Sequence, residues 1–254
     1  MRELLEAGKL NADAMTVSGA TVGENLARPL EVDREVIHTL ADPVDQHGGV
    51  LMMSGNLFDS AAMKVSVISD EFNAKYLSEP DDPDAFEGPE DYHERIEDPS
   101  LGIDESCILV MRNTGPVGYP GSAEVVNMQP PAALLRRGIK SLPTLGDGRQ
   151  SGTCDSPSIL NASPEAAVGG GLALLRTGDR IRVDLREASV NVLLPDEELA
   201  ERRRLHEPAE LVNQTPWQEI HRQTVSNLST GACMELALKY QDVAHAHGVP
   251  RDSH

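Results

Sequence analysis

The stretch "ESCILVMRNTGPVGYPGSAEV", residues 105–125, joins a run of apolar residues to a loop rich in glycine and proline. The consecutive apolar residues of "ILVM", 108–111, predict a buried strand that ends in a polar turn. In "GPVGYP", 115–120, four of the six residues are glycine or proline. Such a segment follows an irregular path on which the backbone can approach a ligand closely. We therefore expect a central strand that carries a site loop at its carboxyl end.

A second loop of this kind, "GDGRQSGT" at 146–153, follows the strand predicted for "IKSLPTL" at 139–145. Loops at the carboxyl ends of neighbouring strands often form sites, so both loops are expected at one edge. Ser151 and Thr153 are candidate hydroxyls, because the flanking glycines free N–H groups to face an anion. Spacing alone leaves ordinary structural roles open: an Asx turn for Asp147, a cap for Ser151, and a first-turn helix carboxylate for Glu124.

The remaining pattern alternates short strands with short helices. The acidic, proline-rich segment 78–99 is expected to be a solvated excursion with one helix at 89–96. Interleaved strands and helices across 50–205 favour a mixed α/β domain and leave a closed barrel open. Strands are predicted at 49–57, 61–69, 180–185 and 189–194, and helices at 130–138, 163–179, 195–204 and in both terminal segments.

The composition excludes several classes of function. With 41 acidic and 22 basic residues the formal net charge is −19, so the chain repels phosphate backbones and anionic membranes. We expect neither nucleic acid nor a membrane as a partner. Cys107, Cys154 and Cys233 form no CxxC and have no nearby His at ligand spacing, so they indicate neither a disulfide framework nor a metal motif, which favours a cytoplasmic location. The sequence contains no GxSxG nucleophile elbow, no P-loop and no HExxH zinc-protease motif, so these motifs give no indication of function.

Both loops, with "SGNL" at 54–57, "SPEAAVGGGLALLRTGDRIRVDL" at 163–185 and "DEELAERR" at 196–203, resemble the dihydroxy-acid and phosphogluconate dehydratase family. The order and spacing agree from about residue 50 to 205. The segments "GYPGSAEVVNM" at 118–128 and 215–241, and the ending "PRDSH", are similar to the branch that dehydrates pentonates such as arabinonate or xylonate. The resemblance covers essentially the whole chain but only the second half of the family's protein.

The resemblance implies the elimination of water from a 2,3-dihydroxy acid to give a 2-keto-3-deoxy acid. It implies that Ser151 is the alkoxide base, that Glu124 is a Mg²⁺ ligand, and that Thr153 and Gly152 contact substrate. An alkoxide base needs nearby positive charge or N–H groups, which glycines and a metal would supply. The family also uses an iron–sulfur cluster as Lewis acid, and its cysteine ligands are expected to lie outside this chain. The implied fold is a mixed β-barrel-like domain, resembling the swivelling domain of aconitases, with flanking helices at both termini.

The resemblance also predicts the organisation of the chain. Residues 1–45 are expected to be a helical remnant of the family's N-terminal domain with a linker, 46–205 the dehydratase domain and 206–254 a helical extension. Activity is expected to require the N-terminal half, and association as a dimer or with that half is expected. Alternatives are a stand-alone binding domain, a dihydroxy-acid dehydratase of branched-chain amino-acid synthesis, and an unrelated serine hydrolase. The serine hydrolase is disfavoured, because no motif in the sequence places a His and an acid around Ser151.

Overall fold

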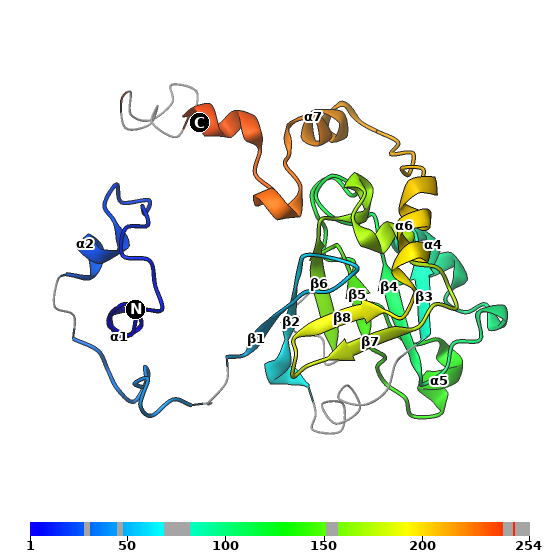
Figure 1. Cartoon of the computed structure of the whole chain (residues 1–254), viewed down its shortest axis with the longest axis horizontal. Helices are drawn as coiled ribbons and strands as arrows, with labels where there is room; N and C mark the ends of the chain where they lie inside the picture. Colours follow the sequence, from blue (N-terminus) through cyan, green and yellow to red (C-terminus); the bar gives the residue numbers. More distant parts are fainter. Residues whose placement is uncertain (28–30, 45–47, 69–81, 151–156, 241–245, 247–254) are drawn as a thin grey trace. The chain divides into compact units, whose positions relative to one another are not determined.

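The computed structural model describes residues 1–27, 31–44, 48–68, 82–150, 157–240 and 246 (Figure 1). The chain divides into two compact units, Met1–Gly48 and Gly49–His254. The described part of the first unit holds two helices of five residues, α1 (Arg2–Glu6) and α2 (Val22–Leu26), and neither buries a side chain. Glu24 and Thr21 form a capping box at α2, which explains why so short a helix begins there.

The second unit is built on a six-stranded sheet with the strand order β1-β2-β6-β5-β4-β3. The strands β3, β4, β5 and β6 run parallel, whereas β2 pairs antiparallel with both β1 and β6. A separate antiparallel hairpin is formed by β7 and β8. The strands are β1 Val50–Met53, β2 Ser60–Lys64, β3 Asp82–Phe86, β4 Cys107–Met111, β5 Thr144–Gly146, β6 Ser158–Ser163, β7 Ile181–Asp184 and β8 Ser189–Val192.

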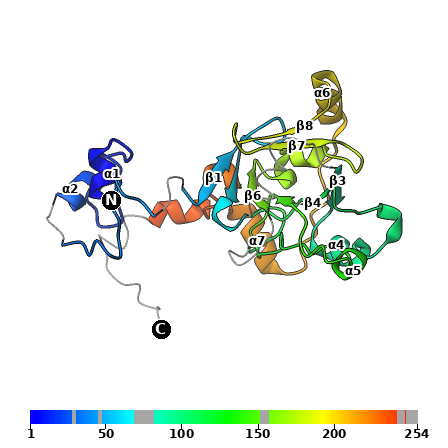
Figure 2. The ribbon, with the colours of Figure 1, turned by 90° about the horizontal axis from the view of Figure 1, so that it is seen from below.

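The central strand β4 is buried at every position, as its apolar run predicts. Ile108 and Val110 face a core shared with the β7–β8 hairpin, and Leu109 and Met111 face a second core. The second core is covered by the helices α4 (Pro89–Arg95) and α5 (Ala132–Arg136), through residues such as Tyr92 and Leu134. Figure 2 shows the resulting layers, with the hairpin on one side of the sheet and α4 and α5 on the other.

Segment 78–99 differs from the expectation of a solvated excursion. Its described part contains the parallel edge strand β3, and Phe86 at the end of that strand is fully buried. Pro83 is compatible with an edge strand, because only one side of the strand must supply ladder hydrogen bonds. The helix predicted at 89–96 is confirmed as α4.

The predicted helix at 163–179 is also wrong. Two short 3₁₀ helices, η3 (Ala166–Val168) and η4 (Gly171–Leu174), follow the end of β6 instead. A Cβ on Gly170 would lie 1.8 Å from the Pro164 carbonyl oxygen, so the glycine run serves a close backbone approach. Side-chain and backbone groups at the start of this segment hydrogen-bond to the two site loops, as described below.

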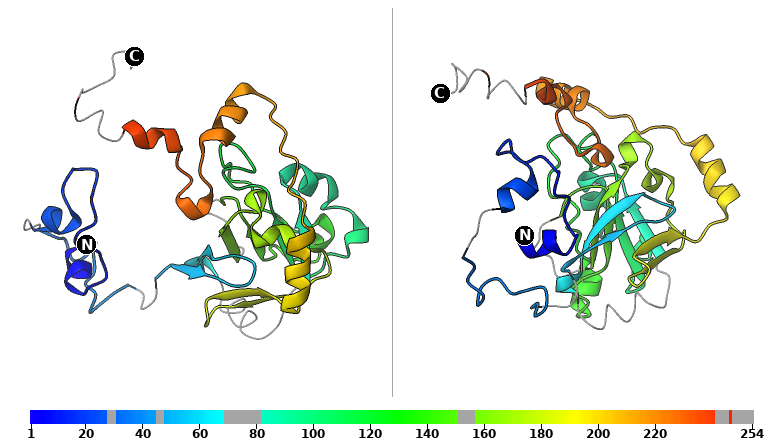
Figure 3. Two further views of the ribbon diagram at one scale, coloured as in Figure 1. Left: turned by 45° about the horizontal axis from the view of Figure 1, so that its top comes forward. Right: turned by 60° about the vertical axis from the view of Figure 1, so that its left-hand side comes forward.

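The C-terminal segment begins with α6 (Asp196–Leu205), which is fixed by the buried ion pair of Arg202 with Asp179 at 2.7 Å. It continues through α7 (Pro216–Thr224), visible beside the loops in Figure 3, to the 3₁₀ helices η5 (Leu228–Thr230) and η6 (Glu235–Tyr240). Two further 3₁₀ helices are η1 (Val65–Val67) and η2 (Pro99–Leu101).

The fold is therefore mixed α/β, with a sheet dominated by parallel pairing and few helices. The closed barrel is not confirmed, because β1 and β3 are the two edges of the described sheet. The flanking helices are not confirmed as packed elements, since α1 and α2 bury no side chain and α7 none either. Within the described ranges, no helix is long and apolar enough to cross a membrane.

Candidate functional site

The two glycine-rich loops leave the sheet side by side. β4 and β5 are adjacent and parallel, with Met111 paired to Gly146 at their carboxyl ends. The loops that begin at Arg112 and Asp147 therefore start at the same end of the sheet, as expected from the sequence. This region, at the carboxyl ends of β4 and β5, is the candidate functional site.

The carboxylate of Asp147 ties the two loops together. It is fully buried and accepts hydrogen bonds from the Thr114 N–H at 2.9 Å and from the Thr114 hydroxyl at 3.0 Å. Its other oxygen accepts the N–H groups of Asn113 at 3.1 Å and Ala166 at 2.7 Å. Asp147 thus joins the β4 loop to the segment after β6 instead of making the local Asx turn that spacing left open.

A second buried carboxylate, Glu165, binds another part of the β4 loop. Its Oε2 accepts the N–H groups of Val117 and Gly118, both at 3.1 Å. A Cβ on Gly115 would lie 2.2 Å from the same oxygen, so only glycine lets this carboxylate approach the loop. Glu165 is not among the candidate residues predicted from the sequence, although the spacing of glycines in "GPVG" is compatible with a close approach of this kind.

Burial controls the ionisation of both carboxylates. It raises the pKa of Asp147, and the N–H groups of Thr114 and Ala166 oppose this by stabilising the charged form. Burial likewise raises the pKa of Glu165 to about 7, against the hydrogen bonds from Gly118 and Val117, with repulsion from Asp147 as a smaller contribution. Glu165 therefore titrates near neutral pH.

The raised pKa of Glu165 makes stability depend on pH. Its pKa is about 7 in the folded chain and near 4.5 in the unfolded chain, so unfolding releases the proton between these values. The stability that protonated Glu165 contributes is complete below pH 4.5 and is lost as the pH rises to 7, in total about 3 kcal/mol. We expect wild type to lose about 2–3 kcal/mol relative to Glu165→Gln between pH 5 and pH 8, in urea unfolding of the full chain.

The control for this prediction is Glu197→Gln, since Glu197 is exposed in the first turn of α6. Its effect on the free energy of unfolding should stay within about 0.5 kcal/mol at either pH. A difference between wild type and Glu165→Gln that is equal at pH 5 and pH 8 would contradict the assignment.

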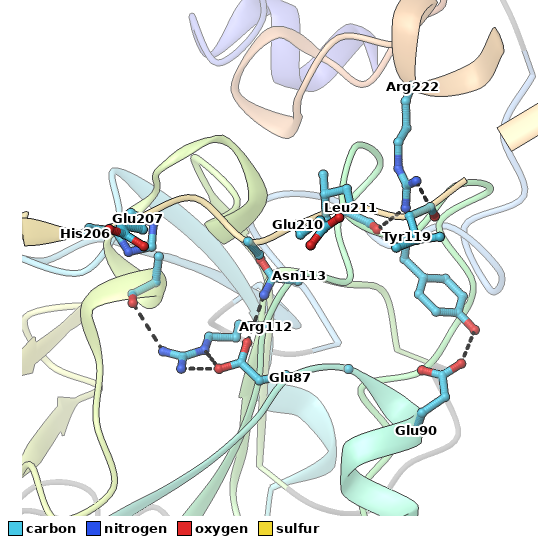
Figure 4. Close-up of a pocket in the computed structure, with 15 residues that line it drawn as sticks. Glu87, Glu90, Arg112, Asn113, Tyr119, His206, Glu207, Glu210, Leu211 and Arg222 are labelled. Atoms are coloured by element: carbon cyan, nitrogen blue, oxygen red, sulfur yellow. Dashed lines mark hydrogen bonds and ion pairs between the residues drawn. The ribbon is translucent and has the colours of Figure 1, made fainter. Parts of the chain in front are cut away.

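The C-terminal segment holds the same loop from outside. The guanidinium of Arg222 on α7 donates to the carbonyl oxygens of Val117 and Gly118, both at 3.0 Å. Figure 4 shows Arg222 above this loop and the ring of Tyr119, a residue of the loop, pointing down to Glu90. Since Glu165 binds the N–H groups of Val117 and Gly118, these two residues are held on both sides. The ring of His221 adds a longer contact, accepting the Gly121 N–H at 3.4 Å.

Glu124 lies in the irregular segment that follows this loop, not in the first turn of a helix. Its carboxylate is about half exposed and pairs with Arg149 of the second loop at 3.1 Å. Ser151, Gly152 and Thr153 lie outside the described residues, as do Cys154, His245, His247 and His254. The structure therefore places Glu124 next to Arg149, which precedes Ser151 by two positions in the sequence. The assignments of Ser151, Gly152 and Thr153 stay predictions.

Glu124 fits the expected Mg²⁺ in chemistry, since an accessible carboxylate oxygen is the ligand that this ion prefers. In the part of the chain that the structure describes, no group of three His, Cys, Asp or Glu side chains is arranged to hold a metal ion. Cys107 is buried in β4 and Cys233 is exposed, and neither belongs to such a group. Among the described residues Glu124 is therefore a candidate oxygen ligand, and no group of side chains forms a complete site for a metal ion.

Two glycine-rich loops leave the carboxyl ends of parallel strands, and accessible polar groups lie beside them. This arrangement is typical of the active-site region of α/β enzymes. A family model for the C-terminal part of dihydroxy-acid/6-phosphogluconate dehydratases matches residues 35–232. The chain belongs to this dehydratase family, as its loops indicate.

Similar proteins include two sugar-acid dehydratases. The chain is 54% identical to D-xylonate dehydratase of Caulobacter vibrioides over 99% of its own length and 43% of that enzyme. It is 36% identical to L-arabinonate dehydratase of Rhizobium leguminosarum bv. trifolii over 100% of its length and 43% of that enzyme. A dihydroxy-acid dehydratase of Agathobacter rectalis is 35% identical over 93% of the chain and 41% of that enzyme. The chain thus spans less than half the length of these relatives.

Proposed function

We propose that this chain supplies the C-terminal part of a sugar-acid dehydratase that converts a 2,3-dihydroxy acid into a 2-keto-3-deoxy acid. The observation that carries the proposal is the 54% identity to D-xylonate dehydratase over 99% of the chain. The identity to the dihydroxy-acid dehydratase is lower, at 35%, which favours a pentonate over a branched-chain acid. The wider proposal includes assembly with an N-terminal portion or as a dimer.

In this proposal the loop after β5 presents Ser151 to the proton on C2 of the substrate. Asp147 fixes the start of that loop through four hydrogen bonds. Ser151 follows this anchored residue by four positions in the sequence. The loop glycines leave N–H groups free to stabilise a serine alkoxide. Glu124 offers an oxygen ligand to Mg²⁺, with Arg149 beside it. When bound, Mg²⁺ and an iron–sulfur cluster would supply Lewis acidity toward the substrate oxygens.

The test is to join this chain to the N-terminal portion of the Caulobacter relative, in place of that enzyme's own C-terminal part. We call this protein the assembled dehydratase. It is expected to release a 2-keto-3-deoxy acid from D-xylonate, measured by a carbonyl-specific assay, whereas the 254-residue chain alone is expected to release none. Turnover by the isolated chain would contradict the need for a second part. A folded, metal- and cluster-loaded assembled dehydratase that leaves D-xylonate unchanged would contradict the function.

A further inference from the structure

A cavity of about 490 Å³ lies between the two loops and the C-terminal segment. Arg149 and Gln150 line it from the loop after β5, and His221 lines it from α7. Arg149 pairs with Glu124, and Gln150 directly precedes Ser151 in the sequence. The cavity is therefore lined by the partner of Glu124 and by the residue that precedes Ser151 in the sequence, and the proposed function assigns metal binding to Glu124 and proton abstraction to Ser151.

Two polar side chains that line the cavity, Gln150 and His221, have hydrogen-bond donors available for a ligand. The side-chain nitrogen of Gln150 is buried and has no hydrogen-bond partner among the described residues. Such a group costs free energy until a partner reaches it. His221 accepts the Gly121 N–H at Nε2, which leaves its Nδ1 to carry the ring proton as a donor. Both groups are donors, so a hydroxyl group suits them because its oxygen can accept a hydrogen bond.

Apolar side chains also line the cavity, among them Leu160, Val225 and Leu228. An acyclic polyol has C–H groups along its carbon chain and hydroxyls around it, so it can contact apolar and polar lining groups together. The charged lining groups already have partners: Arg149 pairs with Glu124, and Asp147 accepts four hydrogen bonds. The cavity thus suits an uncharged polyhydroxylated segment better than a second carboxylate or phosphate.

We propose that this cavity binds the hydroxylated carbons beyond C3 of an acyclic sugar acid, with Gln150 and His221 as the hydroxyl-binding residues. The inference rests on the proposed function and adds the structural basis of its substrate class. A branched-chain dihydroxy acid carries only alkyl groups beyond C3, and would leave the buried amide of Gln150 without a partner. A site built to bind hydroxyls discriminates strongly against an analogue that lacks them.

The test compares two substrates in the assembled dehydratase: D-xylonate, and 2,3-dihydroxypropanoate, which ends at C3. Gln150→Leu and His221→Phe are each expected to lower kcat/KM for D-xylonate by about 10- to 100-fold, mainly through KM. For 2,3-dihydroxypropanoate the same variants should stay within about threefold of wild type. The matched control is His93→Phe, since His93 is exposed on α4 and should change neither value.

The ratio of the two kcat/KM values separates specificity from damage, because a misfolded loop would lower both values by the same factor. Equal losses on both substrates, or no loss on D-xylonate, would overturn the inference while leaving the dehydratase function in place. An assembled wild type that converts neither substrate would instead overturn the proposed function, and the assignment of the cavity with it.

Discussion

Asp147→Ala is expected to lower the free energy of unfolding of the chain by about 4 kcal/mol. The substitution removes the acceptor of four hydrogen bonds, from the N–H groups of Asn113, Thr114 and Ala166 and from the Thr114 hydroxyl. Each buried donor left without a partner costs about 1–3 kcal/mol, and water entering the vacated space offsets part of that loss. The measurement is urea unfolding of the full chain at pH 7.

Two comparisons sharpen this prediction. Asp59→Ala is the control, because Asp59 is an exposed acid in the same unit, and its effect should stay within about 0.5 kcal/mol. Asp147→Asn keeps the shape and one acceptor oxygen but turns an NH₂ group toward two donors, so it should cost about half as much as alanine. Hydrogen exchange at Thr114 should accelerate in the alanine variant. A loss below about 1 kcal/mol would show that the carboxylate does not anchor the loops.

The parallel edge that positions the site could be predicted from sequence, because its signals are local. The apolar run at 108–111 and the glycine-rich segments after it and after Leu145 depend only on neighbouring residues. The structure confirms that β4 and β5 are adjacent and that their loops start together. A pattern of this kind needs no long-range information to be read correctly.

The strand β3 was missed because its sequence, "DPDAF", lacks the apolar alternation of a typical strand. Its pairing with β4 is a property of the sheet, which supplies the neighbour that makes Asp82–Phe86 extended. The helix expected after Ser163 failed for a related reason. The hydrogen bond from Ala166 to Asp147 and the tight approach of Gly170 to Pro164 replace an α-helical path.

The two buried carboxylates of the site could not be predicted from the sequence. Asp147 contacts Thr114 across 33 positions of sequence, and Glu165 contacts Val117 across 48. Nothing within a short window distinguishes these acids from the many exposed ones in this chain. Their roles follow from the fold, which buries them against the N–H groups of one loop, so only the structure could assign them.

Ser151→Ala in the assembled dehydratase is expected to lower kcat for D-xylonate by about 1000-fold, with KM changed less than about threefold. In the proposed mechanism Ser151 accepts the C2 proton, and alanine has no group that can do so. Substrate binding should persist, because the hydroxyl-binding cavity and Glu124 remain in place. Initial rates of 2-keto-3-deoxy acid formation, together with KM, give both quantities.

The control for that loss is Ser54→Ala, since Ser54 is an exposed serine in the same unit and should retain activity within about twofold. Glu124→Gln provides a different signature: the Mg²⁺ concentration that gives half-maximal rate should rise, and excess Mg²⁺ should restore part of kcat. Ser151→Ala should not respond to added Mg²⁺, because the missing group is a base and not a ligand. An alanine variant at 151 that keeps more than a tenth of the wild-type rate would assign proton abstraction to another residue.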